Sequence, residues 1–219
     1  MKLVIIYNNF ARDDLIAGWG FSCLIINGEQ KILFDTGNNG LALLDNLEKL
    51  GVSAKEIDKI VISHEHWDHI GGLFDLINSN NRAIVYTLSS SSKDFKNRIK
   101  QKTKVIEITT PQKIAENIYT TGLIKNNPDE QSLILKTNKG LVVIVGCSHP
   151  GVKNILEITK KYGKIYALIG GLHSFSDFNL LNGISMIGAC HCTRYIKEIK
   201  EKFPNQFKEI KAGDSFEWN

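Results

Sequence analysis

One order of secondary-structure elements, a hairpin followed by a helix and a strand, occurs twice along the chain and restricts the fold strongly. Its first copy is a hairpin over 22–35, a helix over about 41–50 and a strand over 59–63. Apolar runs rich in β-branched residues predict the strands, and the Asn27-Gly28 pair predicts the hairpin turn. Strands that alternate with helices in this way indicate an α/β fold.

The second copy, over 132–169, has the same order of elements. No Pro/Gly-rich linker separates the two copies, so we expect a single domain over 1–219 built from two halves, about 1–125 and 126–219. The predicted architecture is an αββα sandwich, in which two mixed β-sheets pack face to face and the helices lie outside.

The composition is that of a soluble globular chain, with 42% hydrophobic and 23% charged residues. The N-terminal apolar run is short and lacks a small-residue cleavage site, and no apolar segment approaches the ~20 residues of a membrane span. We therefore expect a cytoplasmic protein that does not associate with membranes. The 27 basic and 23 acidic residues are interspersed, which favours solvated helix faces over a nucleic-acid surface.

All six histidines come just after apolar runs that predict strands, and three of them stand close together. These three histidines, His64, His66 and His69, lie with Asp68 within six consecutive residues. Burying so much imidazole and carboxylate without a partner would be costly, so this strand-to-helix turn predicts a metal site. We expect His64 and His66 to bind one ion, and Asp68 and His69 to reach a second. Two neighbouring ions are typical of hydrolytic enzymes.

Other polar residues also end predicted strands. His149 and His191 end strands in the second half, and we predict both as metal ligands. Three roles stay open for His173: a metal ligand, a proton donor that faces the substrate, or a group that orients a ligand. Asp35 ends a strand of the first half, where a carboxylate is expected to orient a ligand histidine or to hold the loop.

The residues around these histidines give further expectations. If the histidine between Cys190 and Cys192 points into the site, strand alternation predicts that both cysteines point away from it. Cys147 comes two residues before His149 and could approach the metals, but its expected role is packing in the core. The lack of a Cys-x-x-Cys pair argues against an iron–sulfur cluster. Thr193 is expected to cap the helix that follows. Trp67 is expected either to line the pocket or to anchor its loop in the core.

These motifs resemble the metallo-β-lactamase superfamily, and the resemblance covers nearly the whole chain. It rests on Phe34-Asp35-Thr36-Gly37, on His64-x-His66-x-Asp68-His69-x-Gly71-Gly72 and on the later single histidines. The stretches 146–151, 170–173 and 191–193 are similar to one branch of the superfamily, the 7,8-dihydropterin-6-methyl-4-(β-D-ribofuranosyl)-aminobenzene-5'-phosphate synthases.

The resemblance implies two metal sites with three ligands each: His64, His66 and His149 at the first, and Asp68, His69 and His191 at the second. It implies one or two divalent ions per chain, zinc first, with manganese or iron as alternatives. The dinuclear hydrolases of the superfamily have a bridging aspartate where this chain has His173, and losing that negative charge would weaken the second site. Arg194 replaces a glycine of the branch; it is a candidate phosphate-binding group, and the alternative is that it points to solvent.

The expected function is that of a metal-dependent hydrolase or related transferase acting on a small phosphorylated substrate. The metal would lower the pKa of a bound water toward ~7, and the metal-bound hydroxide would attack phosphorus or a carbonyl. Asp68 would orient that hydroxide, and His173 or His191 would protonate the leaving group. Two alternatives stay open: a mononuclear iron dioxygenase acting on a thiol substrate, and a metal-binding protein without turnover.

Overall fold

The computed structural model describes residues 1–218, which divide into two compact units. Unit 1 comprises Met1–Thr109 with Lys211–Glu217, and unit 2 comprises Thr110–Ile210 with Trp218. The division after Thr109 lies before the boundary near residue 125 that the sequence suggests, because the two strands that follow it along the chain belong to the second sheet.

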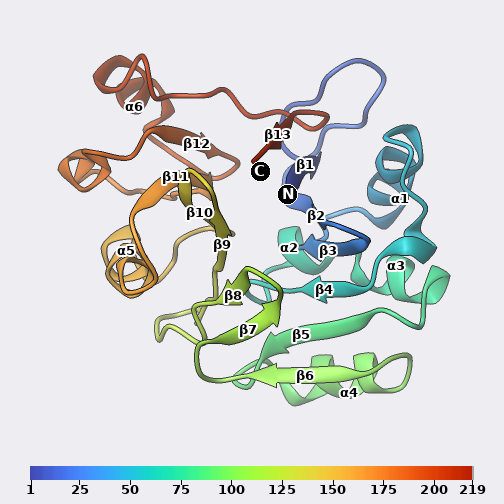
Figure 1. The fold of residues 1–219 in the computed structure, drawn as a ribbon. Helices are drawn as coiled ribbons and strands as arrows, with labels where there is room; N and C mark the ends of the chain where they lie inside the picture. Colours follow the sequence, from blue (N-terminus) through green and yellow to red (C-terminus); the bar gives the residue numbers. More distant parts are fainter. Residues whose placement is uncertain (219) are drawn as a thin grey trace. The chain divides into compact units, whose positions relative to one another are not determined.

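Unit 1 is a mixed β-sheet with helices on one face (Figure 1). Its strands are β1 (Lys2–Tyr7), β2 (Ser22–Asn27), β3 (Gln30–Phe34), β4 (Lys59–Val61), β5 (Ile84–Leu88), β6 (Val105–Ile108) and β13 (Ser215–Glu217). Its helices are α1 (Gly40–Lys49), the 3₁₀ helix η1 (Ala54–Glu56), α2 (Trp67–Ile70), α3 (Leu73–Ser79) and α4 (Lys93–Lys100). The seven strands lie in the order β13-β1-β2-β3-β4-β5-β6. The pairs from β13 to β3 are antiparallel, and those from β3 to β6 are parallel.

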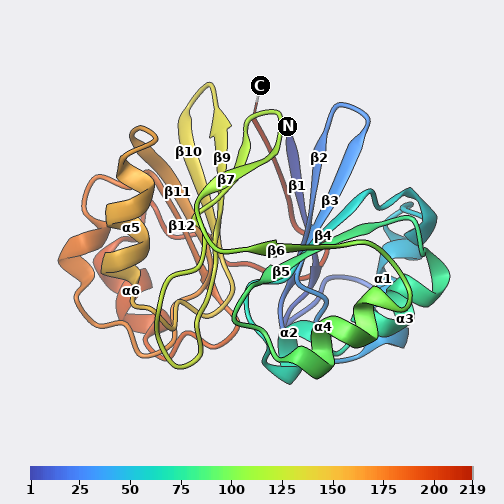
Figure 2. The same ribbon diagram turned by 90° about the horizontal axis from the view of Figure 1, so that it is seen from below.

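The helices of unit 1 are held by apolar side chains that recur at helical spacing. In α1, Leu43 and Leu47 lie four residues apart, so they share one face of the helix and enter the buried cluster with Leu33 of β3 and Ile60 of β4. Side chains of α3 and α4 join the same cluster, which explains why these helices cover one face of the sheet (Figure 2).

Unit 2 repeats this plan with a second mixed sheet. Its strands are β7 (Gln112–Ala115), β8 (Ile118–Thr120), β9 (Leu133–Thr137), β10 (Gly140–Val145), β11 (Ile165–Gly171) and β12 (Met186–Cys190). Its helices are α5 (Val152–Lys160), the 3₁₀ helix η2 (Phe178–Leu181) and α6 (Ile196–Lys202). The six strands lie in the order β12-β11-β10-β9-β8-β7. The pairs β10·β11 and β11·β12 are parallel and the others are antiparallel.

The two mixed sheets with flanking helices confirm the predicted α/β class. The predicted hairpin of β2 and β3 forms, but its turn lies one residue later than the Asn27-Gly28 pair: Asn27 pairs with Gln30, so Gly28 and Glu29 make the turn. Gly28 has φ +62°, a conformation that glycine adopts without a Cβ penalty. None of the helices in residues 1–218 has the length and apolar character needed to cross a membrane.

Gly170 in β11 has no room for a side chain. Its φ is +129°, and a Cβ there would lie 2.0 Å from the carbonyl oxygen of Val145 in β10. At Gly183 φ is +82°, but no atom lies within 4 Å of the added Cβ. We expect Gly170→Ala to lower the free energy of unfolding by about 1–3 kcal/mol more than Gly183→Ala, because only the first substitution forces a steric clash. Chemical denaturation of both variants measures the difference, and equal losses would contradict the expectation.

Candidate metal centre

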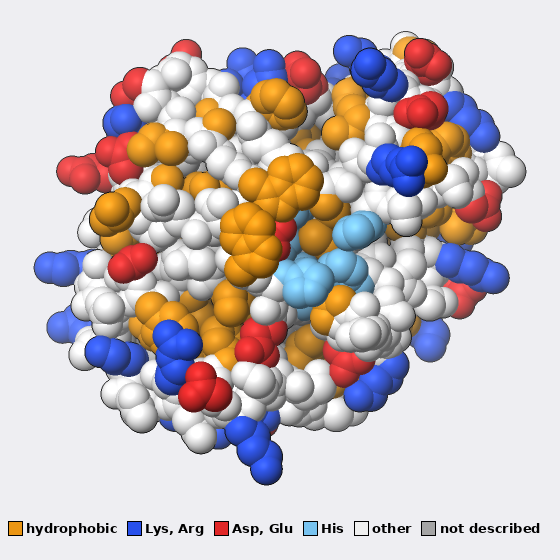
Figure 3. Space-filling model, turned by 180° about the vertical axis from the view of Figure 1, so that it is seen from behind, with side chains coloured by type: hydrophobic (Ala, Val, Ile, Leu, Met, Phe, Trp, Pro, Cys, Tyr) orange, Lys and Arg blue, Asp and Glu red, His pale blue; other side chains and the backbone are white. Residues whose placement is uncertain are grey.

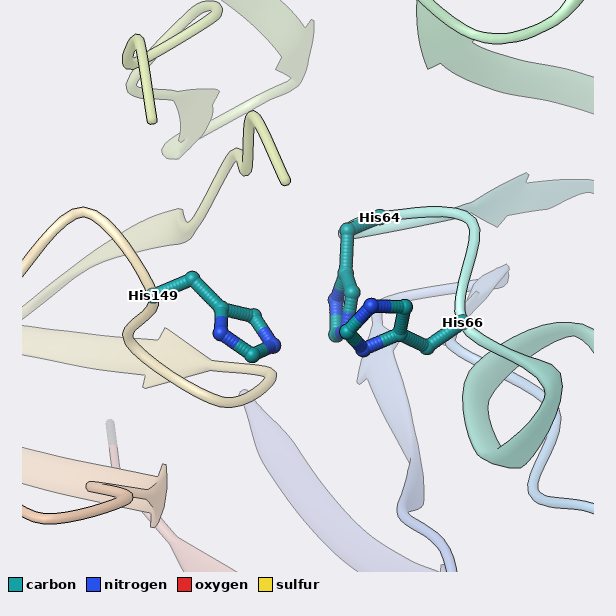
Figure 4. Close-up of side chains that lie close together, drawn as sticks. All are labelled: His64, His66 and His149. Atoms are coloured by element: carbon teal, nitrogen blue, oxygen red, sulfur yellow. The ribbon is translucent and has the colours of Figure 1, made fainter. Parts of the chain in front are cut away.

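The histidine-rich stretch of unit 1 forms the turn between β4 and α2. His64 and His66 lie on the connecting loop, and Asp68 and His69 lie on α2. The ring centroid of His64 is 4.7 Å from that of His66 and 4.2 Å from that of His69. Figure 4 draws His64 and His66 on this loop, and it draws His149 on the loop after β10 of unit 2. The structure therefore brings the three predicted ligand histidines of unit 1 together.

Asp35, which directly follows β3, organises this turn through a buried carboxylate. Its Oδ1 accepts a hydrogen bond from the backbone N of Ser63 at 2.7 Å, and its Oδ2 accepts one from Ser63 Oγ at 2.7 Å. The same Oδ2 lies 2.7 Å from Nδ1 of His69. Ser63 Oγ in turn lies 2.9 Å from Nδ1 of His64. One carboxylate thus holds two histidines, one directly and one through a serine.

These contacts set the tautomers of the two rings. Ser63 donates its hydroxyl proton to Asp35, so its oxygen accepts from His64, and we assign the proton of that ring to Nδ1. His69 likewise donates from Nδ1 to the carboxylate. In both rings the lone pair is then on Nε2, the nitrogen that points away from these contacts. This arrangement is typical of histidines that bind metal.

The conformation of Asp35 allows the effect of its charge to be isolated. Its φ is +56°, a region that asparagine also tolerates, so Asp35→Asn changes the charge without a backbone penalty. We expect metal affinity to fall about 10- to 100-fold, because the carboxylate orients His69 and Ser63. The free energy of unfolding should fall by about 1–3 kcal/mol, since an amide nitrogen would face buried donors. Metal titration and chemical denaturation measure both losses, with Asp94→Asn as the control because the side chain of Asp94 is 82% exposed. Equal metal affinity and equal stability of the two variants would contradict the expectation.

Asp68 and the neighbouring loop have further supports. Oδ2 of Asp68 accepts a hydrogen bond from Nε1 of Trp19 at 2.9 Å and lies 3.9 Å from Nε2 of His69. The carboxylate of Glu65 accepts hydrogen bonds from the backbone N and the hydroxyl of Ser92, at 2.7 and 2.6 Å, which ties the loop to the start of α4. Trp67 is 62% exposed, so it does not anchor the loop in the core.

Tyr7 of β1 supports the loop that carries Asp35. A Cβ on Gly37 would lie 2.7 Å from the Tyr7 ring, so glycine lets the ring and the loop approach closely. Burial raises the pKa of the Tyr7 phenol above its ordinary value. Its hydroxyl donates a hydrogen bond to Oδ1 of Asn38. The loop is thereby fixed on the side of β1 as well as at Ser63.

In unit 2, one buried carboxylate holds the loop that carries His149. Oε1 of Glu130 accepts from the backbone N–H groups of Gly146, Cys147 and Ser148 at 3.1, 2.9 and 3.0 Å. Its Oε2 accepts from the backbone N–H of His149 at 2.8 Å. Glu130 is not among the predicted site residues, because a glutamate between two polar residues just before a strand has the pattern of an exposed loop. Its only local signal is that it lies shortly before β9.

The other two histidines of unit 2 also follow strands. His173 follows β11, is exposed, and has its ring centroid 4.9 Å from that of His149. Both line a cavity of about 210 Å³. His191 follows β12 and is buried. His66 and His173 are both exposed. Figure 3 shows histidine side chains, coloured pale blue, on the surface of the face that it draws.

Arg194 is exposed, and its backbone N–H donates to the carbonyl of His173 at 2.8 Å. Its guanidinium carbon lies 5.5 Å from the ring centroid of Tyr195. The predicted substrate-binding arginine and the predicted catalytic histidine are therefore neighbours in space within unit 2.

The predicted orientation of Cys192 is wrong. β12 ends at Cys190, and His191 has φ +52°, so the alternation of a strand does not continue through these residues. Cys147 Sγ, a ring nitrogen of His191 and Cys192 Sγ all lie within 4.8 Å of one another. Cys192 thus points to the same side as His191. Cys147 is buried, as expected.

The predicted helix cap at Thr193 is also wrong. α6 begins at Ile196, its N-cap is Tyr195, and no side chain caps it. The hydroxyl of Thr193 instead donates to the carbonyl of Cys190 at 2.7 Å and accepts from the backbone N of Leu172 at 2.9 Å. Thr193 therefore joins the ends of β11 and β12.

The donors of unit 1 fit a divalent ion. Imidazole nitrogens with supported tautomers, together with a carboxylate, are the ligands that zinc and related ions take in proteins. Unit 1 supplies His64, His66, Asp68 and His69, and unit 2 supplies His149 and His191 on separate strand ends.

Known proteins share both the sequence pattern and the fold. Residues 19–152 match the family model of the metallo-beta-lactamase superfamily. The chain is 28% identical to the 7,8-dihydropterin-6-methyl-4-(beta-D-ribofuranosyl)-aminobenzene-5'-phosphate synthase of Methanocaldococcus jannaschii, over 84% of this chain and 83% of that protein. It is 30% identical to an uncharacterized protein of the same organism, over 82% of each chain.

Solved structures also resemble this chain. Tm1679, a metal-dependent hydrolase of the beta-lactamase superfamily, is 25% identical with a TM-score of 0.80, over 99% of this chain and 98% of that one. The metallo-beta-lactamase fold protein YhfI from Bacillus subtilis is 18% identical with a TM-score of 0.76, over 99% of each chain, and shows the likeness of fold. From its sequence match, its two mixed sheets and its histidine-rich strand ends, we conclude that this chain belongs to the metallo-beta-lactamase superfamily.

Proposed function

We propose that this chain is a metal-dependent hydrolase, or a related transferase, acting on a small phosphorylated molecule. The observation that carries the proposal is the buried network in which Asp35 and Ser63 hold Nδ1 of His69 and His64. Such a network costs conformational freedom and prepares two imidazoles for a cation. The likeness to a protein described as a metal-dependent hydrolase, and to one named for a ribofuranosyl 5'-phosphate, supports the reaction and substrate classes.

The proposed ligand sets follow the superfamily resemblance: His64, His66 and His149 for the first ion, and Asp68, His69 and His191 for the second. These donors suit zinc, and they also suit manganese or iron. When bound, such an ion supplies Lewis acidity and a water of lowered pKa. With His173 in place of a bridging carboxylate, we propose that the second ion binds more weakly than the first.

The chain's own residues would then bind and orient the substrate. Trp19 fixes the carboxylate of Asp68 through Oδ2, and we propose that Asp68 orients the attacking hydroxide by accepting a hydrogen bond from it. Arg194 would pair with the phosphate charge of the substrate. His173 stands next to Arg194 and lines a cavity with His149, so it would donate a proton to the leaving-group oxygen.

His173 can be separated from the metal ligands by experiment. If His173 is the proton donor, His173→Gln should keep the wild-type metal content and lower kcat by about 10²- to 10⁴-fold. Metal analysis and steady-state kinetics of this variant check the expectation, with Ser174→Ala as the exposed neighbouring control. A fall in metal content that accounts for the lost rate would instead assign His173 as a ligand.

The proposal as a whole is tested by metal reconstitution of the full chain. Zinc, manganese or ferrous iron would be loaded in turn, and hydrolysis of bis(p-nitrophenyl) phosphate and p-nitrophenyl phosphate would be measured. We expect hydrolysis that depends on zinc or manganese. One bound iron with oxygen uptake on a thiol substrate and no hydrolysis would establish the dioxygenase alternative. Bound metal with no turnover would favour the non-catalytic alternative.

A further inference from the structure

Unit 2 brings two reduced thiols together from distant parts of the chain. Sγ of Cys147 lies 3.3 Å from Sγ of Cys192, although the two residues are 45 positions apart. Cys147 lies on the loop after β10 and is only 3% exposed, whereas Cys192 lies on the loop after β12 and is half-buried. The remaining cysteines, Cys23 and Cys190, are both buried.

We propose that Cys147 and Cys192 form a reversible disulfide under oxidising conditions. An S–S bond is about 2.05 Å long, so the two sulfurs need to approach by little more than an ångström. Both cysteines lie outside the strands, on loops where Ser148 and His191 already adopt positive φ angles of 60° and 52°. The adjustment therefore falls on turns and leaves the ladder hydrogen bonds of β10 and β12 intact.

Hydrogen peroxide is a sufficient oxidant, and the exposures set the order of the two steps. Cys192, the more exposed of the two residues, attacks a peroxide oxygen through its sulfur: an S–O bond forms, the O–O bond breaks, and the leaving hydroxide takes up the proton of the Cys192 thiol to give water. Cys147 then attacks the Cys192 sulfur: the S–S bond forms, the S–O bond breaks, and a second water leaves. Two thiols and one peroxide thus give one disulfide and two waters, with two electrons passing from sulfur to oxygen.

The cross-link would join the two loops that carry His149 and His191. His149 follows Cys147 by two residues, and His191 directly precedes Cys192. The formation of the disulfide does not depend on the proposed metal chemistry. Only its effect on metal binding rests on the proposed function, so the test measures the cross-link itself.

Peptide mapping of the oxidised full chain tests the proposal. The chain is treated with hydrogen peroxide and digested with trypsin without reductant, which releases peptides 140–153 and 165–194. We expect these two peptides to be linked, the intact mass to fall by two hydrogen atoms, and dithiothreitol to reverse both changes. The link should be lost in Cys147→Ser and Cys192→Ser, and it should persist in the matched controls Cys190→Ser and Cys23→Ser.

Peptide 165–194 contains Cys190 as well as Cys192, so the position of the link must be resolved. Fragmentation of the linked wild-type peptide identifies the linked cysteine without any variant. This measurement remains possible even if a serine variant fails to fold. A link through Cys192 supports the proposal. A link through Cys190, or conversion of both thiols to sulfinic or sulfonic acids without a linked peptide, would overturn it.

Discussion

Replacing His66 with alanine should reduce phosphoester hydrolysis to the uncatalysed background. In our proposal His66 supplies one of the imidazoles that hold the activating ion, and without that ion the pKa of the attacking water rises back toward its much higher value in bulk water. His66 is exposed and follows β4 on a loop, so the substitution leaves no cavity in the core. We expect the free energy of unfolding of the metal-free chain to stay within about 0.5 kcal/mol of the wild-type value. Metal content, turnover and denaturation of the same preparation measure all three quantities.

The matched control for this experiment is Leu41→Ala. Leu41 is 78% exposed on α1 of the same unit and has no proposed role in metal binding. Its metal content and turnover should equal those of the wild type. If the His66 variant hydrolyses phosphoesters as fast as the wild type, the proposed metal chemistry is wrong. If neither the wild type nor the His66 variant hydrolyses phosphoesters, but the wild type alone holds metal, the chain binds metal without catalysis.

Replacing Glu130 with alanine should cause the largest loss of stability among the substitutions considered for the site. Its buried carboxylate accepts hydrogen bonds from four consecutive backbone N–H groups, from Gly146 to His149. An unmet buried donor costs about 1–3 kcal/mol, so four of them should lower the free energy of unfolding by about 4 kcal/mol or more. That is a large share of the stability of a typical domain. Chemical denaturation measures the loss.

Two companion variants make this prediction specific. Glu130→Gln keeps the shape of the side chain and one acceptor oxygen, so it should lose less stability than Glu130→Ala. It should still weaken metal binding, because the backbone N–H of His149 loses a charged acceptor. Glu116→Ala removes an exposed carboxylate of the same unit and should have little effect. A loss at Glu130 no larger than that at Glu116 would show that the loop does not depend on this carboxylate.

The sequence predicted the strands and the position of the histidines well, because both depend on local signals. An apolar β-branched run predicts a buried strand wherever the partner strand lies, and His64 and His149 come just after β4 and β10, as expected. The contact of Asp35 with His69 also follows the expected pattern, in which a carboxylate at a strand end orients a histidine. Whether these residues bind metal stays a prediction.

The parts that the sequence did not predict depend on where strands end. Strand alternation gave the wrong orientation for Cys192 because β12 ends at Cys190 and His191 has a positive φ. The pattern of side chains in the sequence predicts neither feature. Glu130 was missed because its role depends on four backbone groups of a loop that is distant in sequence. A buried carboxylate whose partners are backbone N–H groups leaves no complementary charge in the sequence to find.

The C-terminal strand β13 pairs antiparallel with β1, and with it the chain returns to unit 1 after completing unit 2. During synthesis on a ribosome, the first sheet therefore keeps β1 as an open edge until everything up to Ile210 has been made. An open strand edge is a template for unwanted pairing, so we expect nascent chains stalled before residue 211 to be prone to aggregation. A gene fragment that stops at Thr109 encodes only six of the seven strands of its sheet, and a self-sufficient version of unit 1 would have to carry residues 211–217 as well.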